Sequence, residues 1–381
     1  MSDATAGSPP GAAQAPPSPA DEVVLKDRLV TAVSNAYCWL FETAAPAGHW
    51  NEVRSTALAG IALCRREAGG CPWLDAIRDW LVSKQVEMGA DQGSWGEELW
   101  DTSMALLALL ELRVPPNDPA IQRALAWQAS LFGANGHHNW HDEPWETSWS
   151  LLAGLKVRQR GGGEPPWDTL KALDWLQSLQ DSEGRIVAPH YTAYFVSICA
   201  ELPDHARGGG RFDAPAQAAA SSLNRSWKDE VLWSGEAWSN GQILWILAAT
   251  GRLDLAGDRA GRLIRWFTSH QGADGSWGRD VEDTASAVLG LHALLLQLEL
   301  RTTPSRSAAE NLIYTQLRRC FQTPIYRPRR DWIESHPDGT TAINLTPRRK
   351  RALSIGLAAV SAVSLLITFW EQIRSIVAGL F

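Results

Sequence analysis

The chain has 381 residues, of which 45% are apolar and 20% are charged, and its formal net charge is −7. This length suffices for one large domain or two ordinary ones. Neither the net charge nor the composition favours nucleic acid as a partner. Five cysteines without a C-x-x-C pair favour unpaired thiols in a reducing compartment over a disulfide framework or a structural zinc site.

The first twenty residues are Ala, Pro, Ser and Gly almost throughout. They lack a basic start and an apolar core, so the sequence predicts no signal peptide. We expect residues 1–22 to form a disordered tail.

Residues 23–303 form a tandem repeat. A turn residue recurs every 44 to 47 positions, at Trp50, Trp95, Trp140, Ile186, Trp233 and Trp277. A small hydroxyl residue follows each turn residue by six or seven positions, at Thr56, Thr102, Thr147, Thr192, Ser239 and Thr284. A second tryptophan series marks the preceding helical segment, at Trp39, Trp80, Trp127, Trp175, Trp227 and Trp266. Repetition therefore explains many of the 20 tryptophans.

Each repeat contains two helical patterns. The first, as in residues 258–271, is amphipathic, whereas the second, as in residues 284–298, is apolar on nearly every side. A helix without a polar face must be buried on all sides. The sequence therefore predicts an all-α fold, an (α/α)6 toroid with an amphipathic outer ring and a buried inner ring. An open solenoid is the alternative, but its concave helices would keep a polar face. No strands are predicted.

The C-terminal part has a different character. Residues 304–351 are basic and punctuated by proline, which predicts a linker that is solvated or contacts anionic headgroups. Residues 352–370 carry no charge and are long enough for a transmembrane helix. Four basic residues precede this run and only Arg374 follows it, so we expect a single-pass anchor, a cytoplasmic N-terminal domain and a short far-side tail at residues 371–381. The alternative is a buried amphipathic helix, which a run apolar on all faces disfavours.

One stretch carries a family resemblance. Gln271 to Ala285 reads Q-G-A-D-G-S-W-G-R-D-V-E-D-T-A. Its Q-x-x-x-G-x-W segment resembles the glutamine–tryptophan repeat of squalene–hopene and oxidosqualene cyclases, and residues 280–285 resemble the D-x-D-D-T-A acid motif of class II terpene cyclases. The resemblance, to the terpene cyclase and protein prenyltransferase superfamily, covers about residues 23–300. It implies an (α/α)6 toroid, in agreement with the repeat.

The resemblance also implies a chemistry. Glu282 would be the proton donor to an alkene or epoxide, with Asp280 and Asp283 as supporting acids. Neighbouring carboxylates help one acid keep its proton, because like charges at close range cannot all ionise. Aromatic side chains on the inner helices would stabilise the carbocation; the candidates are Trp149, Tyr194, Phe195 and Trp245. No metal or other cofactor is implied.

The acids also have a structural interpretation. They begin a helix, where the positive dipole end favours ionised carboxylates, so Asp280 to Asp283 can simply cap it. Asp101 and Glu146 recur at the equivalent position without the rest of the motif. In addition, Glu282 stands where the family has aspartate, and the large triterpene cyclases use two toroids where this chain has one. Asp101, Glu146 and Asp283 can also supply a glycosidase carboxylate pair, although no spacing singles one out.

The loop Gly136 to Glu143 contains three histidines and two carboxylates, a composition that suits a metal as well as a solvated turn. We prefer the solvated turn. Two functions stay open. The first is a membrane-anchored class II terpene cyclase-like isomerase or lyase that acts on an isoprenoid. The second is a non-catalytic toroid that binds a lipid, a peptide or a partner protein at the membrane.

Overall fold

The structure is a computed structural model that describes residues 19–45, 48–66, 72–96, 98–203, 210–228, 230–321, 333–335 and 341–343. The chain divides into two compact units, residues 1–326 and 327–381. The predicted transmembrane run 352–370 and the tail 371–381 lie outside the described residues, as do residues 1–18. Within the described ranges, no helix is both long and apolar enough to cross a bilayer.

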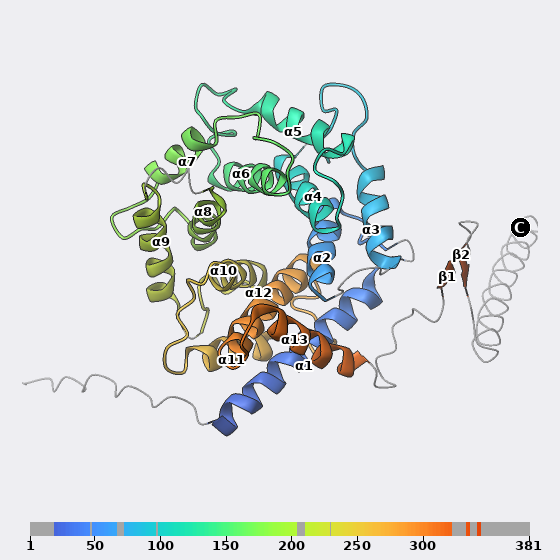
Figure 1. The fold of residues 1–381 in the computed structure, drawn as a ribbon, viewed down its shortest axis with the longest axis vertical. Helices are drawn as coiled ribbons and strands as arrows, with labels where there is room; N and C mark the ends of the chain where they lie inside the picture. The colour runs from blue at the N-terminus through green and yellow to red at the C-terminus, as the bar shows by residue number, and fades with distance from the viewer. Residues whose placement is uncertain are drawn as a thin grey trace, which may run out of the picture. The chain divides into compact units, whose positions relative to one another are not determined.

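The first unit is a double ring of helices (Figure 1). The outer helices are α1 (Pro19–Thr43), α3 (Pro72–Ser83), α5 (Pro119–Leu131), α7 (Thr169–Ser178), α9 (Asp213–Ser226) and α11 (Arg259–His270). The inner helices are α2 (Val53–Arg66), α4 (Leu99–Glu111), α6 (Pro144–Gln159), α8 (Pro189–Glu201), α10 (Ala237–Ala249) and α12 (Val281–Leu300). Each inner helix packs against the next, and α12 packs against α2. The ring is closed, which confirms the toroid and excludes the open solenoid.

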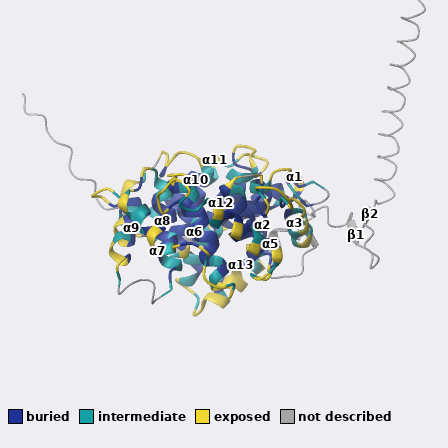
Figure 2. Ribbon diagram, turned by 90° about the horizontal axis from the view of Figure 1, so that it is seen from above, coloured by how far each residue is buried: buried dark blue, intermediate teal, exposed yellow. Residues whose placement is uncertain are grey.

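Burial follows the predicted division of the two rings. Figure 2 shows buried residues concentrated in the inner helices and exposed residues on the outer helices and loops. The outer helix α11 buries Leu263, Ile264, Trp266 and Phe267 on one face, whereas α10 is buried along most of its length. Two inner helices approach closely where Gly241 of α10 faces α12, since a Cβ at Gly241 would lie 2.3 Å from the Ser286 carbonyl oxygen.

The turn residue is fixed by the hydroxyl that follows it. The backbone N–H of Trp277 donates to Thr284 Oγ1 at 3.1 Å. The same bond, at 2.9–3.2 Å, joins Trp50, Trp95, Trp140 and Ile186 to Thr56, Thr102, Thr147 and Thr192. The fifth repeat differs, because Trp233 donates to Asn240 Oδ1 at 3.1 Å and not to the hydroxyl of Ser239, the small hydroxyl residue of that repeat. The Asn240 side-chain oxygen takes the place of the hydroxyl, and its side-chain nitrogen also donates to the Val231 carbonyl.

The indole explains why tryptophan recurs in the turn. Trp277 Nε1 donates at 3.0 Å to the Phe267 carbonyl, in the last turn of α11. Trp95, Trp140 and Trp233 donate in the same way to Leu81, Gln128 and Leu223. The last carbonyls of a helix have no partner within the helix, so a buried indole N–H supplies one.

Gln271 joins the last repeat to the first. Its Nε2 donates to the Gly275 carbonyl at 2.8 Å and to the Ala32 carbonyl of α1 at 2.9 Å. Gly275 has φ +92° and its Cα approaches α1 so closely that a Cβ would lie 2.6 Å from the Asn35 carbonyl oxygen. The glutamine and glycine therefore attach this turn to the next outer helix, and Gln85 and Gln180 do the same in two other repeats.

Parts of the predicted linker 304–351 are ordered, so the linker interpretation is wrong for them. Helix α13 (Arg306–Phe321) packs against α1 and α12 and buries Ala309, Ile313 and Leu317. This i, i+4, i+8 spacing is one helix face, which the surrounding arginines and prolines obscured. In the second unit β1 (Ile333–Ser335) pairs antiparallel with β2 (Thr341–Ile343), and these short strands were not predicted. Helix α1 begins at Pro19, inside the predicted tail 1–22.

Candidate functional site

A pocket of about 730 Å³ opens at the N-terminal ends of the inner helices. We call this end of the toroid the mouth. Its walls combine the acids Glu143, Glu146, Asp280, Glu282 and Asp283 with the aromatic residues Trp100, Trp145, His190, Tyr191 and Trp238. An aromatic and acidic pocket has the chemistry to stabilise positive charge.

The repeat itself builds the mouth. The second residue of each inner helix is Arg54, Trp100, Trp145, His190, Trp238 or Glu282, a set that we call the mouth ring. The residue directly before an inner helix is acidic in five of the six repeats: Glu52, Glu98, Glu143, Glu236 and Asp280. Since equivalent positions of the repeat place side chains at equivalent points around a closed ring, one position per repeat encircles the mouth.

Neighbouring side chains of the mouth ring touch. The Arg54 guanidinium lies 3.8 Å from the Trp100 ring centroid, and the Trp100 and Trp145 centroids are 3.7 Å apart. Trp145 and Trp238 are 6.4 Å apart, although they come from the non-adjacent helices α6 and α10. His190 lies 5.0 Å from Trp238. The aromatic part of the mouth ring is therefore one continuous surface.

Glu282 closes the mouth ring on its charged side. Its Oε1 lies 3.2 Å from Arg54 Nε, and Ser55 Oγ donates to it at 3.4 Å. The same Arg54 Nε lies 3.3 Å from Asp101 Oδ1. The Arg54 guanidinium therefore lies beside two carboxyls, that of Asp101 on α4 and that of Glu282 on α12.

Burial controls the protonation of these two carboxyls. It raises the pKa of Glu282 from 4.5 to about 7, against the opposing charge of Arg54 and with the help of the negative charges of Asp280 and Glu52. Burial also raises the pKa of Asp101 from 3.8 to about 6, again against Arg54. At pH 7 Glu282 is therefore a partly protonated acid beside an aromatic pocket.

The other two predicted acids have different partners. Asp280 is exposed and caps α12, accepting from the backbone nitrogens of Glu282 and Asp283 at 2.8 and 3.0 Å. Asp283 accepts from the Trp238 backbone nitrogen at 2.9 Å and so links α12 to α10. Burial raises the pKa of Asp283 in spite of that hydrogen bond. The capping interpretation thus describes Asp280 well, whereas Glu282 faces the pocket.

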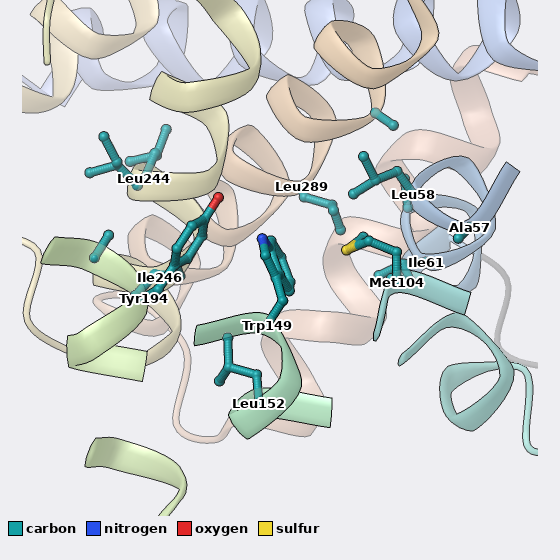
Figure 3. Close-up of a cluster of buried hydrophobic side chains, with 14 of the residues drawn as sticks. Ala57, Leu58, Ile61, Met104, Trp149, Leu152, Tyr194, Leu244, Ile246 and Leu289 are labelled. Carbon is teal, nitrogen blue, oxygen red and sulfur yellow. The ribbon is translucent and has the colours of Figure 1, made fainter. Parts of the chain in front are cut away.

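The predicted carbocation-binding residues lie elsewhere. Trp149, Tyr194 and Phe195 are at most 2% exposed. Figure 3 shows Trp149 in the centre of the ring beside Tyr194 and Leu289, with Met104 and Ile61 close by. The Trp149 and Tyr194 centroids are 4.8 Å apart, and the Tyr194 hydroxyl donates to Gln242. None of these three side chains lines the mouth pocket, and Trp149 and Tyr194 lie in the ring centre. Trp245 lines a different cavity, at the opposite end of the inner ring.

Sequence reasoning missed Arg54, Trp100, Trp145, His190 and Trp238. A signal was present, since all five lie two positions before the residue that accepts from the turn backbone N–H. Aligning the repeats on that residue would have placed them in register with Glu282.

The histidine loop makes pairwise contacts. His137 Nδ1 lies 2.6 Å from Asp142, and His141 Nδ1 lies 2.8 Å from Glu146. The hydrogen bonds from His137 and Asn139 lower the pKa of Asp142. In the described part of the chain, no group of three or more His, Cys, Asp or Glu side chains is placed to hold a metal ion.

Comparison with known proteins shows the fold. Neither the protein-family models nor the curated proteins contain a match to the chain. Among solved structures, the type II terpene cyclase MstE from Scytonema in complex with geranylgeranyl dihydroxybenzoate is similar, with a TM-score of 0.55 and 15% identity over 71% of this chain and 98% of that chain. MstE without ligand has a TM-score of 0.53 and 16% identity, over 71% and 98%. A protein from Actinoplanes has a TM-score of 0.53 and 15% identity, over 70% and 99%. The chain therefore has the α/α toroid fold of the type II terpene cyclases.

Proposed function

We propose that the protein is a class II terpene cyclase-like isomerase or lyase that protonates an isoprenoid with the Glu282 carboxyl. The observation that carries the proposal is a half-buried acid with a pKa of about 7 at the edge of an aromatic pocket. An acid catalyst is most effective when its pKa lies near the working pH. The absence of a second toroid in the described part of this chain does not argue against catalysis. The similarity to the type II terpene cyclase MstE covers 98% of that chain, so that cyclase also has little beyond one toroid.

Six residues at or beside the mouth would then have a role in the reaction. Glu282 transfers its proton to an alkene carbon or an epoxide oxygen, and the substrate becomes a cation. The π faces of Trp100, Trp145 and Trp238 stabilise that cation. Arg54 and Ser55 stabilise the Glu282 carboxylate that forms when the proton is transferred. A carbon next to the final cation then loses a proton to water at the open pocket, which forms an alkene, and the Glu282 carboxylate regains a proton from water. One proton is added and one is removed, so the overall reaction is an isomerisation.

The charge of the mouth selects the substrate. Acids line the pocket, and Arg54 of the mouth ring is already shared by Glu282 and Asp101. A diphosphate or carboxylate headgroup would be repelled there. We therefore expect a neutral isoprenoid, such as a polyprene, its epoxide or a prenylated phenol, to be preferred to a prenyl diphosphate.

The test is product analysis with a matched variant. Purified full-length protein is incubated with squalene, squalene epoxide or a geranylgeranylated phenol, and products are separated by gas chromatography with mass spectrometry. Glu282→Gln should abolish cyclised product. Glu183→Gln, at a side chain that is 63% exposed on another turn, should not. Identical product profiles from wild type and Glu282→Gln would show that Glu282 is not the acid.

We also propose that residues 352–370 anchor the protein in a membrane with the toroid in the cytoplasm. The charge-free run and the basic residues before it support this. Full-length protein should stay in the membrane pellet after alkaline carbonate extraction, whereas a chain that ends at residue 351 should be released. Release of the full-length protein would contradict the anchor.

A second function, binding without catalysis, is favoured by the burial of Trp149 and Tyr194 in the ring centre and by the acidic mouth. A positively charged peptide segment of a partner protein suits acids interleaved with tryptophan. A lysine- and arginine-rich peptide would then bind with an affinity that falls steeply with salt, and Trp145→Ala would weaken it. Cyclised product from wild type would exclude a purely non-catalytic role.

A further inference from the structure

A second cavity, of about 470 Å³, lies at the C-terminal ends of the inner helices, opposite the mouth. Its volume is typical of small-molecule sites. Trp245 and Ala248 of α10 and Leu289, Ala293, Leu296 and Leu300 of α12 form an apolar wall. Helix α13 covers it with Arg306, Glu310 and Tyr314. The cavity shares no lining residue with the mouth pocket, so the two are separate sites.

One titratable side chain in the apolar wall has a defined tautomer. His292 lines the cavity, and its Nδ1 lies 3.2 Å from the Tyr37 hydroxyl. That hydroxyl donates its proton to the Ala62 carbonyl at 3.0 Å. A phenol has only one proton, so Nδ1 must donate to the Tyr37 oxygen.

The other ring nitrogen is therefore an acceptor. Burial lowers the pKa of His292 from 6.5 to about 4, with a further contribution from Arg65, so the ring is neutral at pH 7. A neutral imidazole with a proton on Nδ1 carries a lone pair on Nε2. Since Nδ1 is turned toward Tyr37, Nε2 is the nitrogen available to a molecule in the cavity.

The position of His292 along α12 determines which end of a bound ligand lies deep in the cavity. Leu289, one turn before His292, lies beside Trp149 at the ring centre (Figure 3). Leu296 and Leu300 follow His292 at intervals of four residues on the same helix face. At a rise of 1.5 Å per residue, this apolar stripe runs about 12 Å from His292 toward the end of α12. The acceptor is thus deep, and the apolar wall leads outward.

We propose that this cavity binds an apolar-chain alcohol, head first, with its hydroxyl group donating to His292 Nε2 and its chain lying along α12 beneath α13. A hydroxyl has the donor that the acceptor requires, whereas an ether of the same chain does not. A carboxylate is disfavoured, because it faces a lone pair and because the basic residues nearby are paired. Arg65 lies 3.4 Å from Glu111, and Arg306 lies 2.8 Å from Glu310.

The test compares farnesol with farnesyl methyl ether by isothermal titration calorimetry on the full-length protein. Wild type should bind the alcohol about three- to tenfold more tightly, the range expected for one hydrogen bond. His292→Phe should remove this preference while leaving ether affinity within about twofold, since the ether does not use the Nε2 acceptor and the lost Nδ1 bond to Tyr37 lies outside the ligand contact. Ala293→Phe, which fills the cavity, should weaken both ligands.

The tautomer of His292 can also be measured in wild type, so this part of the test does not depend on whether a variant folds. Long-range proton–nitrogen spectra of wild type should show a protonated Nδ1 and an unprotonated Nε2 for His292, and farnesol should shift the Nε2 signal. Equal affinity of wild type for alcohol and ether, no binding of either, or a proton on Nε2 would overturn the proposal. Glu282→Gln should leave all these values unchanged, so failure here is separate from failure of the mouth chemistry. A preference that depends on Glu282 and not on His292 would place the alcohol at the mouth and overturn the site.

Discussion

Gly275→Ala tests how the toroid closes, because Gly275 is where the last turn touches the first outer helix. The substitution has two costs. The backbone there has φ +92°, which costs an alanine about 1–2 kcal/mol. The new Cβ would also lie 2.6 Å from the Asn35 carbonyl oxygen, and forcing such an overlap costs about 1–3 kcal/mol more. We expect a loss of about 2–5 kcal/mol in the free energy of unfolding.

The chain offers a matched control. Gly89 has φ +94°, but a Cβ there would meet nothing within 4 Å. Gly89→Ala should therefore show only the backbone cost of about 1–2 kcal/mol. Urea unfolding followed by tryptophan fluorescence measures both variants. If Gly275→Ala is no more destabilising than Gly89→Ala, the close contact between this turn and α1 is absent and the account of ring closure is refuted.

Three further predictions concern the same elements. Gln271→Leu should cost about 1–3 kcal/mol in urea unfolding, because the Ala32 and Gly275 carbonyls lose their donor. Gln217→Leu, at an exposed side chain of α9, should change stability by less than about 0.5 kcal/mol. Arg54→Met should raise the pKa of Glu282 further, since the nearest positive charge is removed; an unchanged carboxyl titration would show that Arg54 does not act on it. The raised pKa of Glu282 means that the folded state binds more protons than the unfolded state between about pH 4.5 and 7, so stability falls as pH rises through this window. Relative to Glu282→Gln, wild type should lose about 1–2 kcal/mol across it, a value reduced for partial exposure, and a flat difference would contradict the raised pKa.

The sequence predicted the toroid because the repeat is local. The turn tryptophan, its hydroxyl partner and the glutamine act within one unit or between adjacent ones, so their spacing is visible along the chain. In the fifth repeat, Asn240 beside the recurring hydroxyl residue Ser239 makes the same hydrogen bond with a side-chain amide. A pattern based on hydroxyl residues does not recognise an amide.

The site was harder to predict because its contacts join distant parts of the chain. Arg54 lies 3.2 Å from Glu282 only after the ring closes. The aromatic candidates Trp149, Tyr194 and Phe195 were chosen for lying on inner helices, but that position alone does not separate the filled centre from the mouth. Helix α13 was missed because it carries no copy of the repeat, and its apolar face is obscured by arginines within it and prolines on both sides.

The titration of the Glu282 carboxyl decides whether this side chain can be the proton donor. Carbon-13 labelling of glutamate side chains, with Glu282→Gln to assign the signal, would give its pKa in the folded protein. We expect a pKa of about 7, which keeps much of this carboxyl protonated at neutral pH. A pKa near 4.5 would make Glu282 an ionised partner of Arg54 and would contradict its role as a proton donor.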